Sequence, residues 1–101
     1  MTRLTVTADA ERDTGYILSY LARKAGHEIA ERYANQFRAT IECLLHWPEN
    51  GALRPQLGEA VRIAVVSPNV LIYEYSRSGD TLTLLRILHG RRNITDRLLR
   101  R

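Results

Sequence analysis

The sequence predicts a single α+β domain over residues 1–101, with the element order β-αα-βββ and a short C-terminal helix. Two observations lead to this fold class. Helical periodicity of apolar residues is confined to the first half of the chain, and the alternation typical of strands dominates the second half. Because the connections are short, we expect an antiparallel α-hairpin packed on one face of a small, mostly antiparallel sheet.

The N-terminal segment predicts a short strand followed by a helix. Leu4 and Val6 alternate with polar residues, which is typical of a strand. Thr7 is well placed to cap the following helix, since its hydroxyl can accept a hydrogen bond from the first turn. This helix is expected to run to about Ala25 and to end at Gly26.

A second helix follows directly, and its short connection makes the two helices an antiparallel hairpin. Pro48 is expected to end it. On the first helix, Tyr16 and Tyr20 are expected to contribute to the core or to the contact between the helices. The apolar stripe of the second helix is the most regular in the chain and consists of Ala30, Tyr33, Ala34, Phe37, Ile41, Leu44 and Leu45.

Three strands are predicted in the second half, and two tight turns join them. Ser67-Pro68-Asn69 and Ser78-Gly79-Asp80 are turn sequences between runs of β-forming residues. A short helix from Ile94 to Arg101 is also expected, although it is too brief to be stable unless it docks. The three strands span residues 61–65, 70–75 and 81–89.

Charge is distributed unevenly along the chain. Residues 1–50 carry six basic and seven acidic side chains, whereas residues 51–101 carry nine basic and four acidic ones. A basic second half favours an acidic partner, either nucleic acid or an acidic protein segment. The single cysteine fits a reducing cytoplasm, and no apolar run has the length of a signal peptide or a membrane span. No metal-ligand spacing or cofactor motif is found, so neither a metal nor a cofactor is expected.

Charged residues within the strands are candidates for a structural or functional role. Arg86 interrupts an apolar strand, where a cation needs a partner, and we expect an ion pair with Glu74 or with terminal carboxylates. If Arg62, Glu74 and Arg86 all point to the solvent face, they form a charged patch that could bind an anion; a simple cross-strand ion pair is the alternative.

The end of the last strand gathers further candidates. His89 could act as a general acid or base, or it could simply hydrogen-bond the local backbone. Gly90 frees the backbone to turn, so the side chains of Arg91 and Arg92 should project into solvent, where they are suited to binding a partner.

The order and spacing of several short motifs carry a family resemblance that covers nearly the whole chain. These motifs are Ala30-x-x-Tyr33, Ile41-x-x-Leu44, Pro48-x-x-Gly51, Arg54-x-x-Leu57, Arg62, Leu71-Ile72-Tyr73-Glu74-Tyr75 and Arg86-Ile87-Leu88-His89-Gly90-Arg91-Arg92. With these motifs the chain resembles the ParE branch of the RelE/ParE toxins of bacterial type II toxin–antitoxin pairs.

The resemblance implies a toxin that forms a tight hetero-oligomer with a cognate antitoxin encoded beside it. ParE-like members inhibit DNA gyrase and are not nucleases, whereas RelE-like members cleave messenger RNA on the ribosome. RelE-like chemistry uses lysines and a terminal aromatic residue, but this chain has only Lys24 and no tyrosine after Tyr75. This difference from RelE-like members favours gyrase as the target, and direct binding of nucleic acid is then not expected.

Two alternatives remain open beside the gyrase toxin. In a ribosome-dependent endoribonuclease, Arg62 and Arg86 would hold phosphate and His89 would act as acid or base. In an inactive family member, only antitoxin binding would be retained. Under the gyrase interpretation, Arg91, Arg92 and His89 are the expected target-binding residues.

The mode of antitoxin binding is also predicted. A C-terminal segment of the antitoxin, disordered alone, should fold onto apolar surface left by the helical hairpin and the sheet edge. It would bind as a helix in a groove or as an added strand, and an acidic or amphipathic segment would match the basic half of the chain.

Overall fold

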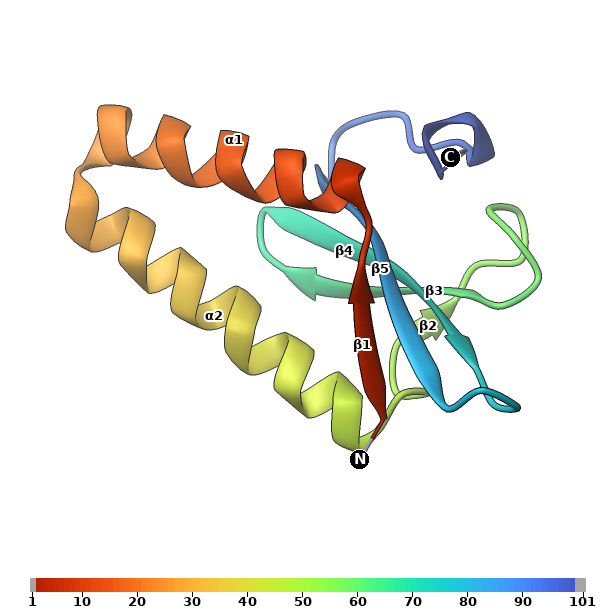
Figure 1. The fold of residues 1–101 in the computed structure, drawn as a ribbon. Helices are drawn as coiled ribbons and strands as arrows, with labels where there is room; N and C mark the ends of the chain where they lie inside the picture. The colour runs from red at the N-terminus through yellow and green to blue at the C-terminus, as the bar shows by residue number, and fades with distance from the viewer. Residues whose placement is uncertain (1, 100–101) are drawn as a thin grey trace.

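The computed structural model describes residues 2–99 and confirms the α+β fold (Figure 1). Its five strands form one mixed sheet in the order β1-β5-β4-β3-β2, in which β1 runs parallel to β5 and the other neighbours are antiparallel. The two-residue strand β2 was not predicted, because a segment so short has no periodicity. In chain order the elements are β1 (Arg3–Val6), α1 (Ala8–Ala25), α2 (His27–His46), β2 (Ala52–Leu53), β3 (Val61–Val66), β4 (Asn69–Ser76), β5 (Thr81–His89) and the 3₁₀ helix η1 (Asp96–Leu99).

The start of α1 is fixed as predicted and is also tied to the sheet. The Thr7 hydroxyl oxygen accepts a hydrogen bond from the Ala10 backbone N–H at 3.1 Å, which is the expected N-cap. The same hydroxyl donates to the Leu85 carbonyl of β5 at 2.8 Å. At the other end, Gly26 adopts a φ of 97° and lets α2 begin immediately, which produces the predicted antiparallel hairpin.

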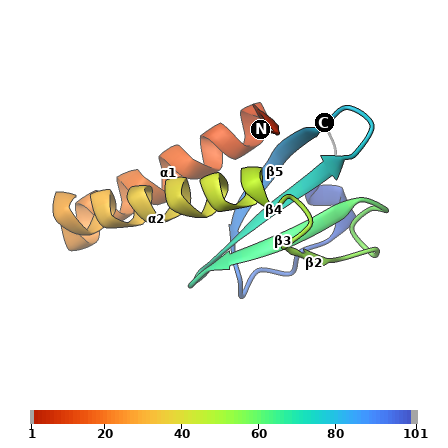
Figure 2. The same cartoon turned by 90° about the horizontal axis from the view of Figure 1, so that it is seen from below.

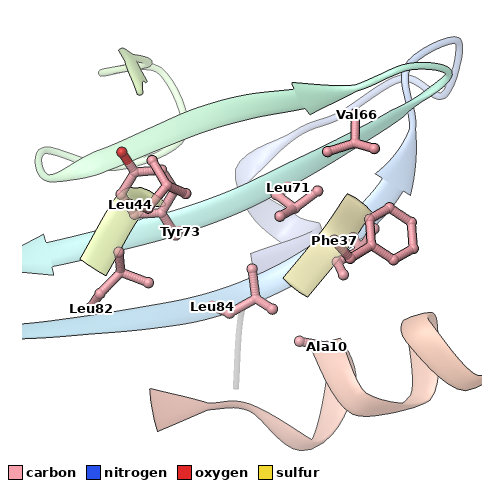
Figure 3. Close-up of a cluster of buried hydrophobic side chains, with 9 residues drawn as sticks. Ala10, Phe37, Leu44, Val66, Leu71, Tyr73, Leu82 and Leu84 are labelled. Carbon is pink, nitrogen blue, oxygen red and sulfur yellow. The ribbon is translucent and has the colours of Figure 1, made fainter. Parts of the chain in front are cut away.

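The main core lies between the helical hairpin and one face of the sheet (Figure 3). Ala10 of α1 is fully buried, and Phe37 and Leu44 anchor α2. From the sheet, the buried side chains are Val66, Leu71, Tyr73, Leu82, Leu84 and Ile87. The stripe predicted for α2 is therefore the stripe that packs against the sheet.

A smaller apolar cluster covers the opposite face of the sheet and decides where the C-terminal segment lies. Figure 2 shows the hairpin on one side of the sheet and the C-terminal segment on the other. The predicted terminal helix is only the 3₁₀ turn η1, and residues 100 and 101 lie outside the described residues. Ile94, Leu98 and Leu99 pack against Val61, Val70, Ile72, Leu85 and Leu88.

Tyr73 fastens the loop after α2 to the core. Its side chain is fully buried, and burial raises the pKa of its phenol. The hydroxyl donates to the Pro48 carbonyl at 2.8 Å and accepts from the Gly51 N–H at 2.9 Å. A Cβ at Gly51 would lie 2.4 Å from this hydroxyl, so only glycine fits there.

Tyr73→Phe is expected to lower the free energy of unfolding by about 1–3 kcal/mol, because the Pro48 carbonyl and the Gly51 N–H would each lose a buried partner. Urea denaturation followed by circular dichroism measures the change. Tyr20→Phe is the matched control, since Tyr20 is 45% exposed and should change stability by less than about 0.5 kcal/mol. Equal stability of the two variants would contradict the role given to the Tyr73 hydroxyl.

Candidate functional site

A groove lies between α1 and the C-terminal end of β5. It forms because β1 pairs with β5 only as far as Leu84, so the rest of β5 has no strand on its outer side among the described residues. The groove has a volume of about 740 Å³. It is lined by Asp13, Tyr16, Ile17, Tyr20, Leu21, Tyr33, Pro68, Asn69, Ile87, Leu88, His89 and Arg92.

Two tyrosines of α1 are exposed in this groove. Tyr16 and Tyr20 are 71% and 45% exposed, and their spacing of four residues places them on one face of the helix. Neither ring is part of the core, which was one of the two positions predicted for them; the other was the contact between the helices. Both rings line the open groove beside the end of β5, where no further strand of the described residues covers them. The hairpin as a whole extends beyond the sheet (Figures 1 and 2).

Arg86 has a carboxylate partner that the sequence did not indicate, Asp13 of α1. The Arg86 guanidinium donates to both Asp13 oxygens, at 2.6 and 2.9 Å. The two side chains are 16% and 14% exposed, and these hydrogen bonds raise the pKa of Arg86. Asp13 also accepts from the Ile87 backbone N–H at 3.0 Å, and Arg86 donates to the Leu98 carbonyl at 2.9 Å.

The strand register places Arg86 and Glu74 at different levels of the sheet. Ile72 lies opposite Arg86, and a register shift follows between Ile72 and Tyr73. Glu74 instead lies opposite Thr83. Asp13 is 73 residues from Arg86 in the chain, so no local pattern could have indicated this contact.

Arg62 and Arg86 do not form the predicted charged patch. Arg62 lies opposite Tyr73 and Arg86 opposite Ile72, and consecutive residues of β4 point to opposite faces of the sheet. Arg62 donates to the carbonyls of Glu49 and Gly51 at 2.8 and 2.9 Å, and its guanidinium lies 3.5 Å from the Glu49 carboxylate. Its contacts hold the loop after α2.

His89 lines the groove together with Arg92, the second of the two arginines that follow it. The Nδ1 atom of His89 accepts from the Arg91 backbone N–H at 3.1 Å, which is the local backbone contact considered from the sequence. Arg91 and Arg92 are both exposed, as expected. Only His89 and Arg92 line the groove, whereas Arg91 lies outside it.

Among residues 2–99, no three or more His, Cys, Asp or Glu side chains gather closely enough to hold a metal ion. No described helix combines the length and the apolar character needed to cross a membrane.

The arrangement of a helical hairpin packed on a five-stranded sheet is also found in a solved structure. A chain from the chromosomal ParDE toxin–antitoxin system of P. aeruginosa has the same fold, with a TM-score of 0.73 and 23% identity, over 88% of this chain and 96% of the other. A conserved hypothetical protein from Helicobacter pylori matches 88% of this chain and 94% of its own, with 18% identity and a TM-score of 0.43.

The family assignment rests on the sequence. The family described as "ParE toxin of type II toxin-antitoxin system, parDE" matches residues 4–94. No curated protein matches the chain. The chain belongs to the ParE toxin family of type II toxin–antitoxin systems, within the RelE/ParE superfamily, as the sequence motifs predicted.

Proposed function

We propose that this ParE-family toxin inhibits DNA gyrase and is neutralised when its cognate ParD antitoxin fills the groove beside α1. The observation that carries the first part is the separation of Arg62, Arg86 and His89. The observation that carries the second part is an apolar groove with exposed tyrosines in a protein whose family is defined by a toxin–antitoxin pair.

The three candidate ribonuclease residues are poorly arranged for joint chemistry. Arg62 and Arg86 lie on opposite faces of the sheet, and each guanidinium is engaged by protein groups. Arg62 pairs with Tyr73 of β4, and His89 pairs with Asn69 of the same strand. Tyr73 and Asn69 are four residues apart, so Arg62 and His89 are separated by roughly 13 Å along the strand direction. A phosphate held by one of these residues would be out of reach of the others. This separation supports a toxin that acts by binding its target.

The groove is suited to an amphipathic helix of the antitoxin. Tyr16 and Tyr20 offer aromatic anchors, and His89 with Arg92 provides a polar, partly basic end for an acidic residue. Addition of a strand is less suitable, because Asp13 already accepts the outward N–H of Ile87. We therefore favour a helix in the groove over an added strand.

The target is tested by two parallel assays of the purified toxin. One contains gyrase and relaxed plasmid, and the other is a translation reaction monitored for codon-specific cuts in messenger RNA. We expect that gyrase no longer supercoils the plasmid and that the messenger RNA stays intact. Cuts in messenger RNA without an effect on gyrase would replace this proposal with the ribonuclease alternative, and His89→Ala would then be the damaging change. No effect in either assay and no growth arrest would indicate an inactive family member.

The double variant Arg91→Ala/Arg92→Ala is expected to weaken gyrase inhibition at least about tenfold, which corresponds to about 1.4 kcal/mol of binding free energy. The reason is that both arginines are exposed beside Gly90 and contribute little to the fold. The matched control is Arg23→Ala/Lys24→Ala, which removes the same charge from an exposed part of α1. Full inhibition by the folded Arg91/Arg92 variant would contradict the assignment of these residues to the target interface.

A further inference from the structure

A second groove lies on the opposite side of the molecule, between α2 and β3. Its volume is about 480 Å³. It exists because β2 pairs with β3 only at Arg62 and Ile63, so the end of β3 has no strand beside it among the described residues. None of the ten residues that line it carries a charge, although the chain as a whole has a net charge of +4.

The exposed part of β3 presents backbone groups that can pair with another strand. On the edge of β3 that faces β2, the Arg54 backbone N–H donates to the Val61 carbonyl. Backbone groups alternate in direction along a strand, so those of Val61, Ile63 and Val65 face the same edge. Ala52 lies opposite Ile63, whereas no strand residue within residues 2–99 lies opposite Val65 on this edge. Val65, at this unpaired part of the edge, is 64% exposed.

This edge differs from the open edge of β5. There, the Asp13 carboxylate accepts the Ile87 N–H and places a charge beside the strand. Charged residues at strand edges prevent pairing with other chains. The β3 edge has an exposed valine and an uncharged groove instead, and Ala39, Thr40 and Ala64 leave room for close approach.

We propose that two copies of this chain associate through this face, with β3 pairing antiparallel to β3 of the second copy about a twofold axis. The sheet would continue from one copy to the other, and the two α2 helices would lie side by side on the same face of it. The helices must contribute, because a few strand residues alone fall short of the roughly 1,200 Å² that specific interfaces bury.

Charge argues for a second copy as the occupant. Two chains of net charge +4 repel each other least when the surfaces in contact are uncharged, and the lining of this groove is uncharged. An acidic antitoxin segment would gain more from the groove that contains His89 and Arg92. A twofold axis also lets Val65 of each copy meet the same residue of the other, so that both sets of outward backbone groups are paired.

The test compares the wild-type protein with Val65→Arg and Leu4→Arg over low micromolar to millimolar concentrations by sedimentation equilibrium. Leu4 is the matched control, since it is an aliphatic residue, 42% exposed, on the edge strand β1 at the other side of the sheet. We expect wild type and Leu4→Arg to dimerise with the same affinity, and Val65→Arg to dimerise at least about tenfold more weakly. Circular dichroism verifies that both variants fold.

The cysteine gives an independent readout. Cys43 is exposed, lines this groove and is the only cysteine in the chain, so a bis-maleimide can link two copies only through it. Linked dimer is expected from wild type and from Leu4→Arg, and much less from Val65→Arg.

Three results would overturn the proposal. These are a monomer at all concentrations, a dimer that Val65→Arg leaves unchanged, and self-association that occurs only when antitoxin is present. The outcome is independent of the proposed function, because Val65 lies outside the groove of α1. Val65→Arg should therefore bind antitoxin and act on the target as the wild type does.

Discussion

Arg86→Ala is expected to lower the free energy of unfolding by about 2–4 kcal/mol. Removing one partner of a largely buried ion pair leaves the other charge without compensation, and this cost is typically about 3–5 kcal/mol. The lower range applies here because Arg86 and Asp13 retain 16% and 14% exposure. The variant also loses the hydrogen bond to the Leu98 carbonyl, so the C-terminal segment loses one of its attachments to the sheet. Urea denaturation at neutral pH measures the loss.

Asp13→Ala should destabilise by a similar amount, because it removes the same pair and also leaves the Ile87 N–H without its acceptor. The double variant should be less destabilised than the sum of the single ones, since neither charge is then left alone. Arg12→Ala is the control. Arg12 is paired with Asp9 on the surface of α1 and is 71% exposed, so its loss should cost less than about 0.5 kcal/mol. Arg86→Ala and Arg12→Ala variants of equal stability would refute this role of the Arg86–Asp13 pair.

Tyr16→Ala and Tyr20→Ala are each expected to weaken binding of the cognate antitoxin by about 2 kcal/mol or more, which is roughly 30-fold in affinity. Aromatic side chains that are exposed in the free protein and line an apolar groove are the usual anchors of an interface. Tyr16→Ala should leave the stability of the free toxin almost unchanged, because its ring is 71% exposed. Isothermal titration calorimetry of each variant with the antitoxin measures the change.

Trp47→Ala is the matched control for this experiment. Trp47 is also an exposed aromatic residue, at 68%, but it follows the end of α2 and does not line the groove. Its replacement should leave antitoxin affinity unchanged. If Trp47→Ala weakened binding while both tyrosine variants bound normally, the antitoxin site would have to be sought near the end of α2.

The helices and the three longer strands could be predicted from the sequence because their signals are local. Thr7 is followed by a helix that it can cap, and Pro48 follows a stripe with regular helical spacing; both depend on residues a few positions apart. The alternation in residues 61–65 similarly predicted that Arg62 and Ile63 face opposite sides of the sheet. The motifs predicted the ParE family for the same reason, since their order along the chain is itself a property of the sequence.

The sites depended on contacts between distant segments, and only the tertiary structure decided them. Arg86 clearly needed a carboxylate, but the sequence could not choose between Glu74 and Asp13, because the choice rests on the shifted register of β5 and the position of α1 above it. Tyr16 and Tyr20 had the spacing of core residues, yet they line an open groove and are 71% and 45% exposed. Periodicity therefore determined which face of each element is apolar, and tertiary packing determined which of those faces another element covers.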